Sequence, residues 1–234
     1  MNLLLIEPDE IANGRVALRG RRADHLRRVR GIAPGDRLAA GVLDGGLGEA
    51  TVLEITPDSI SIELTIEREP PPALPLTLVL ALPRPKVMRR VLQGIAAIGL
   101  KRVVLIGSWR VEKSYWESPY LQPQALREQL VLGLEQGGDT RLPCVELYRR
   151  FKPFVEDELP SIAGDSACFV AHPVAALDCP RGQTGHLVLA VGPDAGFSDY
   201  EVQRLRESGF TAVTLGPRLL RVEQAIPALI GRLL

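Results

Sequence analysis

The sequence contains 234 residues, 46% of them hydrophobic, which is enough apolar material for one large or two small folded domains and excludes a disordered chain. Its 28 basic residues balance 28 acidic residues, so the net charge is zero. Composition therefore gives no overall indication of a nucleic-acid partner, and any site for a polyanion must be local.

Metal sites and membrane segments are not indicated. The cysteines and histidines lack the spacing of metal ligands: Cys144, Cys168, Cys179, His25, His172 and His186. The N-terminal stretch MNLLLIEPDE turns acidic at once, unlike a signal peptide or a membrane anchor, and no segment has the roughly 20 consecutive apolar residues that cross a bilayer. We therefore expect a metal-free cytoplasmic protein with reduced cysteines.

The first 68 residues have the pattern of a small β-rich barrel or sandwich. Short, partly alternating strands are separated by Gly, Pro and Asp, and one helical pattern interrupts them at residues 23–31. The prolines of EREPPPALP, residues 67–75, deny the backbone both a continuing helix and a ladder of N–H donors. We place a linker at residues 69–75 and a second domain at residues 76–234.

The second domain has the sequence pattern of an α/β fold with a parallel sheet. Apolar runs alternate with helical patterns, as expected of buried parallel strands with helices on both faces. The predicted strands are 76–82, 102–107, 167–171, 187–192 and 211–216. The predicted helices lie near 86–98, 121–136, 152–159 and 199–208, with a last one after Arg221.

The stretch LVLAVGPDAGFSDYEVQRLRESGF, residues 187–210, predicts a strand, a glycine turn and a capped helix. Ser198 followed by Glu201 fits a capping box, and Gly209 stands where a helix C′ residue belongs. Only Gly192 and Gly196 are present in the turn, so it is not the dinucleotide fingerprint G-x-G-x-x-G, and without Lys-Ser or Lys-Thr it is not a phosphate loop. The turn is either a plain connection or part of a ligand site.

A second stretch, VTLGPRLLRVEQA at residues 213–225, again ends an apolar strand in Gly-Pro. The carboxyl ends of parallel strands meet at one edge of a sheet, where open α/β sheets bind ligands. Two such turns offer backbone N–H and C=O groups side by side. This arrangement predicts a site for a small, partly apolar ligand.

Two segments have the composition of nucleic-acid contacts. Residues 15–30 contain one acidic residue, Asp24, and seven arginines: Arg15, Arg19, Arg21, Arg22, Arg27, Arg28 and Arg30. Such a cluster neutralises phosphates without reading sequence, although charge runs are also commonly solvated helix faces. In SWRVEKSYWESPY, residues 108–120, Arg110 and Lys113 accompany Trp109, Tyr115, Trp116 and Tyr120. These aromatic rings either stack on bases or belong to the core or a subunit interface.

Three ordered motifs carry a family resemblance: LEQGGDTRLP (134–143), AVGPDAGFS (190–198) and LGPRLLRVEQA (215–225). Together they resemble the ribosomal RNA uridine N3-methyltransferases of the RsmE type, in the SPOUT superfamily. HLRRVRGIAPGDRL (25–38) looks like that family's PUA-like RNA-binding domain, and KVMRRVLQGIAAIGLKRV (86–103) resembles the start of its catalytic domain. The resemblance spans most of the chain.

The resemblance implies a PUA-like β-barrel at residues 1–68 and a SPOUT domain at 76–234 whose C-terminal segment forms a trefoil knot, a feature that connection rules alone never predict. It implies S-adenosylmethionine as cofactor, a homodimer, and methyl transfer to N3 of a uridine in 16S ribosomal RNA, free or in the small subunit. The implied cofactor residues are Val170, Ala171, His172, Leu189, Val191, Gly192, Pro193, Gly196, Leu215, Gly216, Leu219, Leu220 and Val222. From their charge and position we predict RNA contacts at Arg21, Arg22, Arg27, Arg28, Arg30, Arg110 and Lys113.

Within that framework Arg221 and Glu223 are the candidate catalytic residues. The arginine fork can hold a phosphate or the uracil oxygen as negative charge develops. Glu223 either orients that arginine or acts as the base, and the two residues can also form a plain salt bridge at a helix start.

The chain departs from the family pattern at several positions. Ala195 replaces a glycine where the backbone can need a positive φ, and Gln224 replaces a threonine. Ala97 replaces a glutamate, and Gln136–Asp139 differs from the usual Gln-Ser/Cys-Gly-Arg. Two alternatives therefore stand beside the uridine methyltransferase: a divergent SPOUT enzyme for another RNA position, and a non-catalytic RNA-binding or assembly protein. A nucleotide-dependent dehydrogenase is disfavoured by the missing fingerprint.

Overall fold

The computed structural model describes residues 2–234, apart from the side chains of residues 29 and 30. The predicted phosphate contact of Arg30 therefore lies outside the described side chains. Contacts divide the chain into two compact units. The smaller one comprises the chain up to Pro72 together with Val131–Leu142, and the larger one comprises Ala73–Leu130 and Pro143–Leu234.

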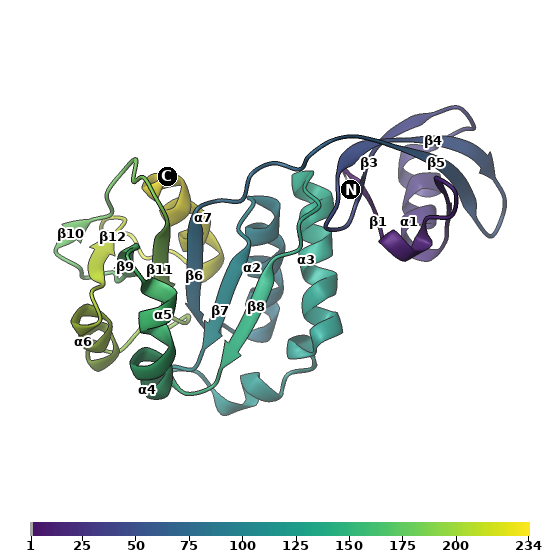
Figure 1. The fold of residues 1–234 in the computed structure, drawn as a ribbon. Helices are drawn as coiled ribbons and strands as arrows, with labels where there is room; N and C mark the ends of the chain where they lie inside the picture. Colours follow the sequence, from purple (N-terminus) through teal and green to yellow (C-terminus); the bar gives the residue numbers. More distant parts are fainter. Residues whose placement is uncertain (1) are drawn as a thin grey trace. The chain divides into compact units, whose positions relative to one another are not determined.

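The smaller unit contains one curled five-stranded sheet in the order β1-β3-β4-β5-β2 (Figure 1). Strands β1 and β3 pair in parallel and the other neighbours are antiparallel. The strands are β1 (Leu4–Ile6), β2 (Arg15–Leu18), β3 (Arg37–Val42), β4 (Leu47–Ile55) and β5 (Ile60–Arg68). A short 3-10 turn at Pro8–Glu10 follows β1, and α1 (Gly20–His25) continues through a π-helical turn at Leu26–Arg30.

Alternating side chains make the core of the smaller unit. Val16 and Leu18 of β2 are buried while Arg15 and Ala17 are exposed, which is the period of two expected of a strand with one covered face. These residues pack with Ile60 and Ile62 of the neighbouring β5 and with Ala23 and Leu26 of the helix. The β-rich pattern and the helical segment predicted at residues 23–31 are confirmed, whereas strand β1 was not predicted.

The larger unit is built on a seven-stranded, wholly parallel sheet in the order β10-β12-β9-β11-β6-β7-β8. The strands are β6 (Leu76–Ala81), β7 (Arg102–Ile106), β8 (Cys144–Tyr148), β9 (Ala167–Ala171), β10 (Leu177–Asp178), β11 (Leu187–Val191) and β12 (Thr211–Thr214). The α/β class with a parallel sheet is confirmed, as are the five predicted strands to within two residues. Strands β8 and β10, at the two edges, were not predicted.

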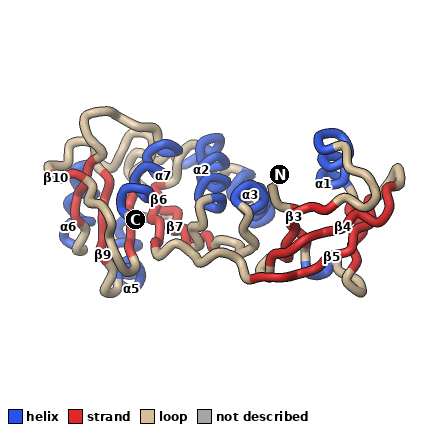
Figure 2. The backbone as a smooth tube through the Cα atoms, turned by 90° about the horizontal axis from the view of Figure 1, so that it is seen from above, coloured by secondary structure: helices blue, strands red, loops and turns tan. Residues whose placement is uncertain are grey.

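Helices cover both faces of this sheet (Figure 2). On one face lie α2 (Pro85–Ala97), α7 (Val222–Leu233) and the first part of α3 (Pro123–Gly137); on the other lie α5 (Leu159–Ala163) and α6 (Asp199–Glu207). The segment predicted as one helix near 152–159 is α4 (Phe151–Pro153), a π-helical turn at Phe154–Glu158, and α5. Two 3-10 turns, Lys113–Glu117 and Pro119–Leu121, precede α3.

Burial explains why the central strands are apolar at every position. All residues of β6 and β11 are buried because helices cover both of their faces. Burying one Val or Leu side chain contributes about 1.5–3 kcal/mol, so these two neighbouring strands anchor the domain. Strand β9 pairs with β11, so the loops after β6, β9 and β11 leave the sheet at the same edge.

Candidate functional site

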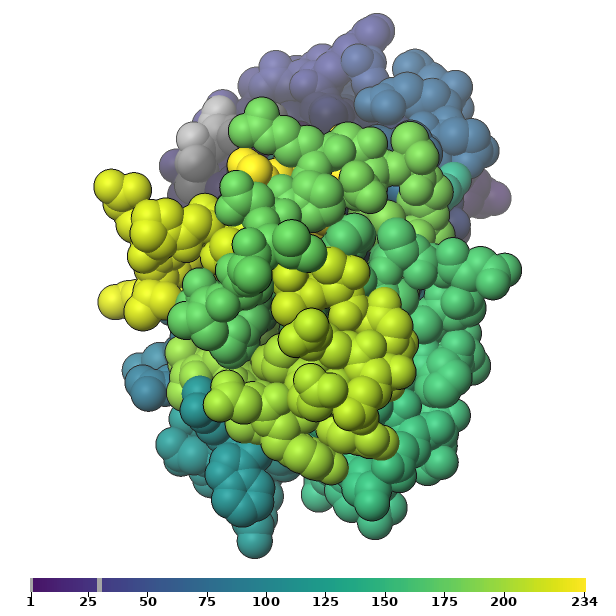
Figure 3. Space-filling model, turned by 90° about the vertical axis from the view of Figure 1, so that its left-hand side faces the viewer, coloured from purple at the N-terminus to yellow at the C-terminus, as the bar shows by residue number. Residues whose placement is uncertain are grey.

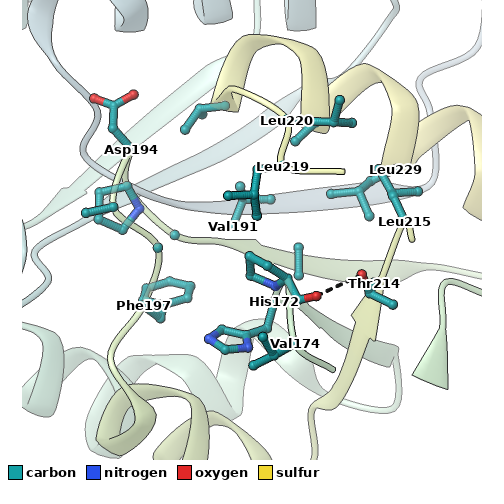
Figure 4. A pocket seen from close by; sticks show the side chains of 18 of the residues that line it. His172, Val174, Val191, Asp194, Phe197, Thr214, Leu215, Leu219, Leu220 and Leu229 are labelled. Carbon is teal, nitrogen blue, oxygen red and sulfur yellow. Dashed lines mark hydrogen bonds between the residues drawn. The ribbon is translucent and has the colours of Figure 1, made fainter. Parts of the chain in front are cut away.

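A cavity of about 420 Å³ opens where β9, β11 and β12 end (Figure 4). All three strands run parallel in neighbouring positions, so the loops that follow them leave from one edge of the sheet. The start of α7 adds Val222, Ala225 and Leu229, spaced three and four residues apart on one helix face. The cavity is thus enclosed by irregular backbone on one side and a helix on the other.

The first glycine turn is tight because two parts of its backbone approach each other. A Cβ at Gly192 would lie 2.6 Å from the backbone nitrogen of Phe197, closer than side-chain carbons occur. Gly196 has a φ of +72°, in the left-handed region, and its N–H donates to the carbonyl of Pro193 at 2.7 Å. Both glycines are therefore required, one for space and one for conformation.

Ala195 does not carry the strain that its departure from the family pattern suggested. Among the described residues other than glycine, only Asn13 and Asp44 have a positive φ. The left-handed conformation in this turn falls on Gly196. A Cβ at position 195 is therefore accommodated, because the residue with positive φ is the next one.

The second turn is held to the loop after β9. Gly216 has a φ of +107°, and its N–H donates to Thr214 Oγ1 at 3.2 Å. The same hydroxyl lies 3.4 Å from the carbonyl oxygen of Pro173, the contact drawn in Figure 4, and the N–H of His172 donates to the carbonyl of Val213 at 2.9 Å. The loops after β9 and β12 therefore form one wall of the cavity.

Glu201 ties the first turn to the loop after β7. The residue is only 2% exposed, and its carboxylate accepts from Ser198 N at 2.8 Å, from Ser198 Oγ at 2.9 Å and from the backbone N–H of Trp109 at 2.8 Å. Ser198 Oγ in turn accepts from Glu201 N at 3.3 Å, which confirms the predicted capping box. A buried carboxylate is tolerated here because three donors and a helix N-terminus surround it.

Two arginines from neighbouring loops also contact the first turn. Arg84, at the start of α2, lies 3.4 Å from the carboxylate of Asp194, and Arg110 donates to the carbonyl of Ala195. Exposed pairs of this kind contribute little to stability. They do place positive charge beside the cavity, which Arg110 also lines.

Most of the residues implied as cofactor contacts line this cavity. They are Ala171, His172, Val191, Gly192, Pro193, Gly196, Leu215, Gly216, Leu219, Leu220 and Val222. The structure does not bring Val170 and Leu189 to it: both side chains are fully buried within their strands. The period of two that puts Ala171 at the cavity turns the preceding Val170 into the core.

Several lining residues were not predicted from the sequence as ligand contacts, among them Phe197, Thr214, Ala225 and Leu229. Ala225 and Leu229 could have been predicted, because they lie three and seven residues after Val222, on the same face of the helix, and Val222 was already assigned to the cofactor. Leu219 and Leu220 are 81% and 44% exposed. In Figure 3 atoms of this C-terminal part of the chain, coloured yellow, project from the surface.

The two candidate catalytic residues lie at the start of α7, outside the cavity lining. Arg221 is the exposed N-cap residue, and its N–H donates to Gln224 Oε1 at 3.4 Å. Glu223 accepts from Arg90 Nη2 at 2.9 Å. A hydrogen bond from its own backbone N–H, followed by Arg90 and with burial opposing, lowers the pKa of Glu223 below 4.5. The carboxylate is therefore a weak proton acceptor.

Much of the basic cluster at the front of the chain is engaged within the smaller unit. Arg21 donates to both oxygens of Glu135, at 2.7 and 2.9 Å, and this hydrogen-bonded pair raises the pKa of Arg21. Arg22 donates to the carbonyl of Leu5 at 2.8 Å and to the Glu10 carboxylate.

Arg27 donates to the carbonyl of Thr56 at 2.6 Å, whereas Arg28 is exposed. Among the predicted RNA contacts of this cluster whose side chains are described, Arg28 is the one that is exposed and whose side chain has no hydrogen bond to another described residue.

The described residues other than the side chains at 29 and 30 contain no group of three or more His, Cys, Asp or Glu arranged to hold a metal ion. In the same part of the chain no helix is long and apolar enough to cross a membrane. The three cysteines are free, and burial raises the pKa of the Cys168 and Cys179 thiols. Neither thiol is therefore activated as a nucleophile.

The chain matches the family model of the RNA methyltransferase domain over residues 69–234. It is 30% identical to ribosomal RNA small subunit methyltransferase E of Treponema pallidum, over 96% of this chain and 87% of that protein. The protein named ribosomal RNA small subunit methyltransferase E 1 of Borreliella burgdorferi is 24% identical, over 96% of this chain and 94% of that protein.

Two solved structures show the same fold. One is a ribosomal RNA small subunit methyltransferase E from Neisseria gonorrhoeae bound to S-adenosyl methionine, with a TM-score of 0.73 and 23% identity over 98% of this chain and 95% of that one. The other, described as a predicted RNA methyltransferase from Thermotoga maritima, has a TM-score of 0.70 and 19% identity over 99% of this chain and 96% of that one. The chain therefore belongs to the RNA methyltransferase family, among the RsmE-type enzymes.

Proposed function

We propose that this enzyme transfers the methyl group of S-adenosylmethionine to N3 of a uridine in 16S ribosomal RNA. The observation that carries the proposal is the cavity built by the two glycine turns at the carboxyl edge of a parallel sheet. Its volume of about 420 Å³ falls in the range of small-molecule sites. The family membership and the names of the relatives support RNA as the methyl acceptor.

The residues present fit S-adenosylmethionine. Leu215, Leu219, Leu220 and Leu229 give the cavity an apolar wall that suits an adenine ring, and the two turns offer backbone N–H and C=O groups for its edges and for the ribose. Gly216 has open space where a side chain would stand, so its backbone is accessible to a ligand. When bound, the cofactor supplies a methyl group already activated by the sulfonium charge.

The protein's own contribution is mainly alignment. Holding two reactants in line can contribute roughly 7–11 kcal/mol to lowering the barrier, whereas a general base contributes about 10²- to 10⁴-fold in rate. We propose that the N3 proton of the uracil passes to water and that Arg221 stabilises the negative charge that then forms on the uracil. Glu223, held by Arg90 and with a lowered pKa, serves to anchor the start of α7 and hence Arg221.

We also propose three features of the larger assembly. The C-terminal segment from β11 to α7 forms a trefoil knot, the smaller unit is a PUA-like RNA-binding domain, and the enzyme acts as a homodimer in the cytoplasm. Exposed Leu219 and Leu220 at the cavity rim support the dimer, because a second copy would cover them. The curled five-stranded sheet with its basic helix supports the RNA-binding role.

The proposal is tested by mapping methylated nucleotides in ribosomal RNA from a strain lacking the gene, using mass spectrometry. Loss of one N3-methyluridine, restored by the wild-type gene but not by Arg221→Ala, is the expected result. An unchanged map contradicts the proposal. Loss of another methylated nucleotide identifies a divergent enzyme. Calorimetry with S-adenosylmethionine separates both from a non-catalytic RNA-binding protein, which would not bind it.

A further inference from the structure

Trp109, in the loop after β7, exposes its ring to solvent beside the cavity. Its side chain is 88% exposed, the largest exposed fraction among the large hydrophobic residues of the described chain. A single exposed apolar residue needs no explanation by itself. The contacts around Trp109, however, indicate a function for its exposure.

The backbone that carries Trp109 is held in place. Its N–H donates to the buried carboxylate of Glu201 at 2.8 Å, and the N–H of Val111 closes the turn onto the carbonyl of Ser108 at 3.0 Å. The next residue, Arg110, donates to the carbonyl of Ala195 in the first glycine turn. The indole therefore projects from a fixed support instead of a mobile loop.

The position of this support is next to the proposed site of methyl transfer. Strand β7 pairs in parallel with β6, which pairs in parallel with β11, so the loops after β7 and β11 leave from the same edge of the sheet. Arg110 lines the cavity directly. Trp109 consequently stands at the approach to the cavity rather than at a distant surface.

The other aromatic side chains of the segment have partners within the protein. The guanidinium of Arg89 lies 4.9 Å from the ring centre of Tyr120, and that of Arg149 lies 5.9 Å from the ring centre of Trp116. The hydroxyl of Tyr115 donates to Glu112 at 3.0 Å. Of the four rings that the sequence brought to attention, Trp109 is the one left for an external ligand.

We propose that Trp109 stacks on an unpaired base that neighbours the methylated uridine, while Arg110 contacts the phosphate beside it. The inference rests on the proposed RNA substrate. A rigid, exposed indole next to cationic side chains suits a splayed-out base, since base–aromatic stacking is the common mode by which proteins hold single-stranded RNA. Arg110 uses one of its five N–H donors on Ala195, and the others remain for a phosphate.

The test measures methyl transfer by Trp109→Ala, Trp109→Phe and Trp116→Ala to one acceptor, unmethylated 16S ribosomal RNA in small subunits from the deletion strain. Loss of one stacked base should raise KM for the subunit about 10- to 100-fold in Trp109→Ala. Trp109→Phe keeps an aromatic ring for stacking, so its KM should stay close to the wild-type value. Binding of S-adenosylmethionine and the melting temperature should stay at wild-type values in Trp109→Ala, because the indole is outside the core. Trp116→Ala, the matched control, should lower the melting temperature and leave KM unchanged.

Fluorescence provides a readout that does not depend on methyl transfer. The chain has two tryptophans, so Trp116→Phe leaves Trp109 as the only one. Quenching of its emission by the subunit RNA supports stacking, even if the methylated nucleotide differs from the proposed one. RNA binding without quenching, or a wild-type KM in Trp109→Ala, overturns the inference and leaves the proposed function intact. A change in sedimentation of Trp109→Ala also overturns it, since a second copy of the chain would then cover the ring.

Discussion

Gly192 offers a direct test of how the first glycine turn works, because the space for its missing side chain is filled by backbone. A Cβ there would lie 2.6 Å from the nitrogen of Phe197 and 2.9 Å from the carbonyl carbon of Gly196. Ordinary contacts of a Cβ begin at 3.4 Å, so in Gly192→Ala the opposite arm of the turn must move by about 0.8 Å. No flexible side chain can absorb the shift, which passes to the residues lining the cavity.

Overpacking of this kind costs about 1–3 kcal/mol, which we expect to see as a lower free energy of unfolding in denaturant titrations. Binding of S-adenosylmethionine should weaken at least about tenfold in calorimetry, or ~1.4 kcal/mol, because the turn would present its backbone groups out of position.

Substitutions at two other glycines distinguish a steric clash from a change in backbone conformation. Gly94→Ala, in the exposed face of α2 with nothing within 4 Å, should stabilise the protein by about 0.5–1 kcal/mol and leave binding unchanged. Gly196→Ala has open space but a φ of +72°, so it should cost about 1–2 kcal/mol through conformation alone. Wild-type affinity and stability in Gly192→Ala would refute this account of the turn.

Three further predictions concern charged side chains. Glu201→Gln places an amide N–H₂ among three donors, so the free energy of unfolding should fall by about 1.5–3 kcal/mol, whereas the exposed Glu207→Gln should change it little. Arg21→Ala leaves the buried Glu135 carboxylate without its partner and should lower the melting temperature of the protein, while Arg28→Ala should weaken RNA binding and its salt dependence without changing that temperature. The pKa of Glu10 is lowered below 4.5, chiefly by a hydrogen bond from its arginine partner, so this group stabilises the fold above pH 4.5 and the contribution is lost as pH falls through the folded pKa. Glu10→Gln should therefore reduce stability at neutral pH and flatten the acid limb of the stability profile; an unchanged acid limb would exclude the pair as its cause.

Local sequence was sufficient wherever the determining contact is local. The two residues of the capping box, Ser198 and Glu201, are three positions apart, and the structure shows both of its hydrogen bonds. The central strands were predictable because each is an apolar run buried on both sides. Strand β8 was missed because it lies at the sheet edge, where exposed and half-buried residues interrupt the apolar pattern.

Partners distant in the sequence account for what could not be predicted. Nothing near Arg21 indicates that it pairs with Glu135, 114 residues away, or that Glu201 also accepts from Trp109, 92 residues before it. The arginine cluster therefore resembled a free basic surface. The exposure of the aromatic residues could not be predicted for the same reason. The sequence does not distinguish the four rings of one segment, but in the structure three of them contact two arginines and a glutamate, and the ring of Trp109 does not.

The departures from the family pattern bear on whether the chain has kept catalysis, and those at Ala97, Gln136–Asp139 and Gln224 lie outside the cavity lining. Ala97 ends α2, and Gln224 accepts a hydrogen bond from the backbone N–H of Arg221, so it caps the helix that carries the catalytic candidate. Asp139 accepts from the N–H groups of Thr140 and Arg141 at 2.7 and 3.0 Å, where the chain leaves α3. Ala195 lines the cavity but leaves the left-handed conformation to its neighbour. Gln224 and Asp139 thus make capping hydrogen bonds, and Ala195 leaves the turn unstrained. These observations weaken the case for a protein that has lost its cofactor site. Binding of S-adenosylmethionine is the measurement that distinguishes an enzyme from such a protein.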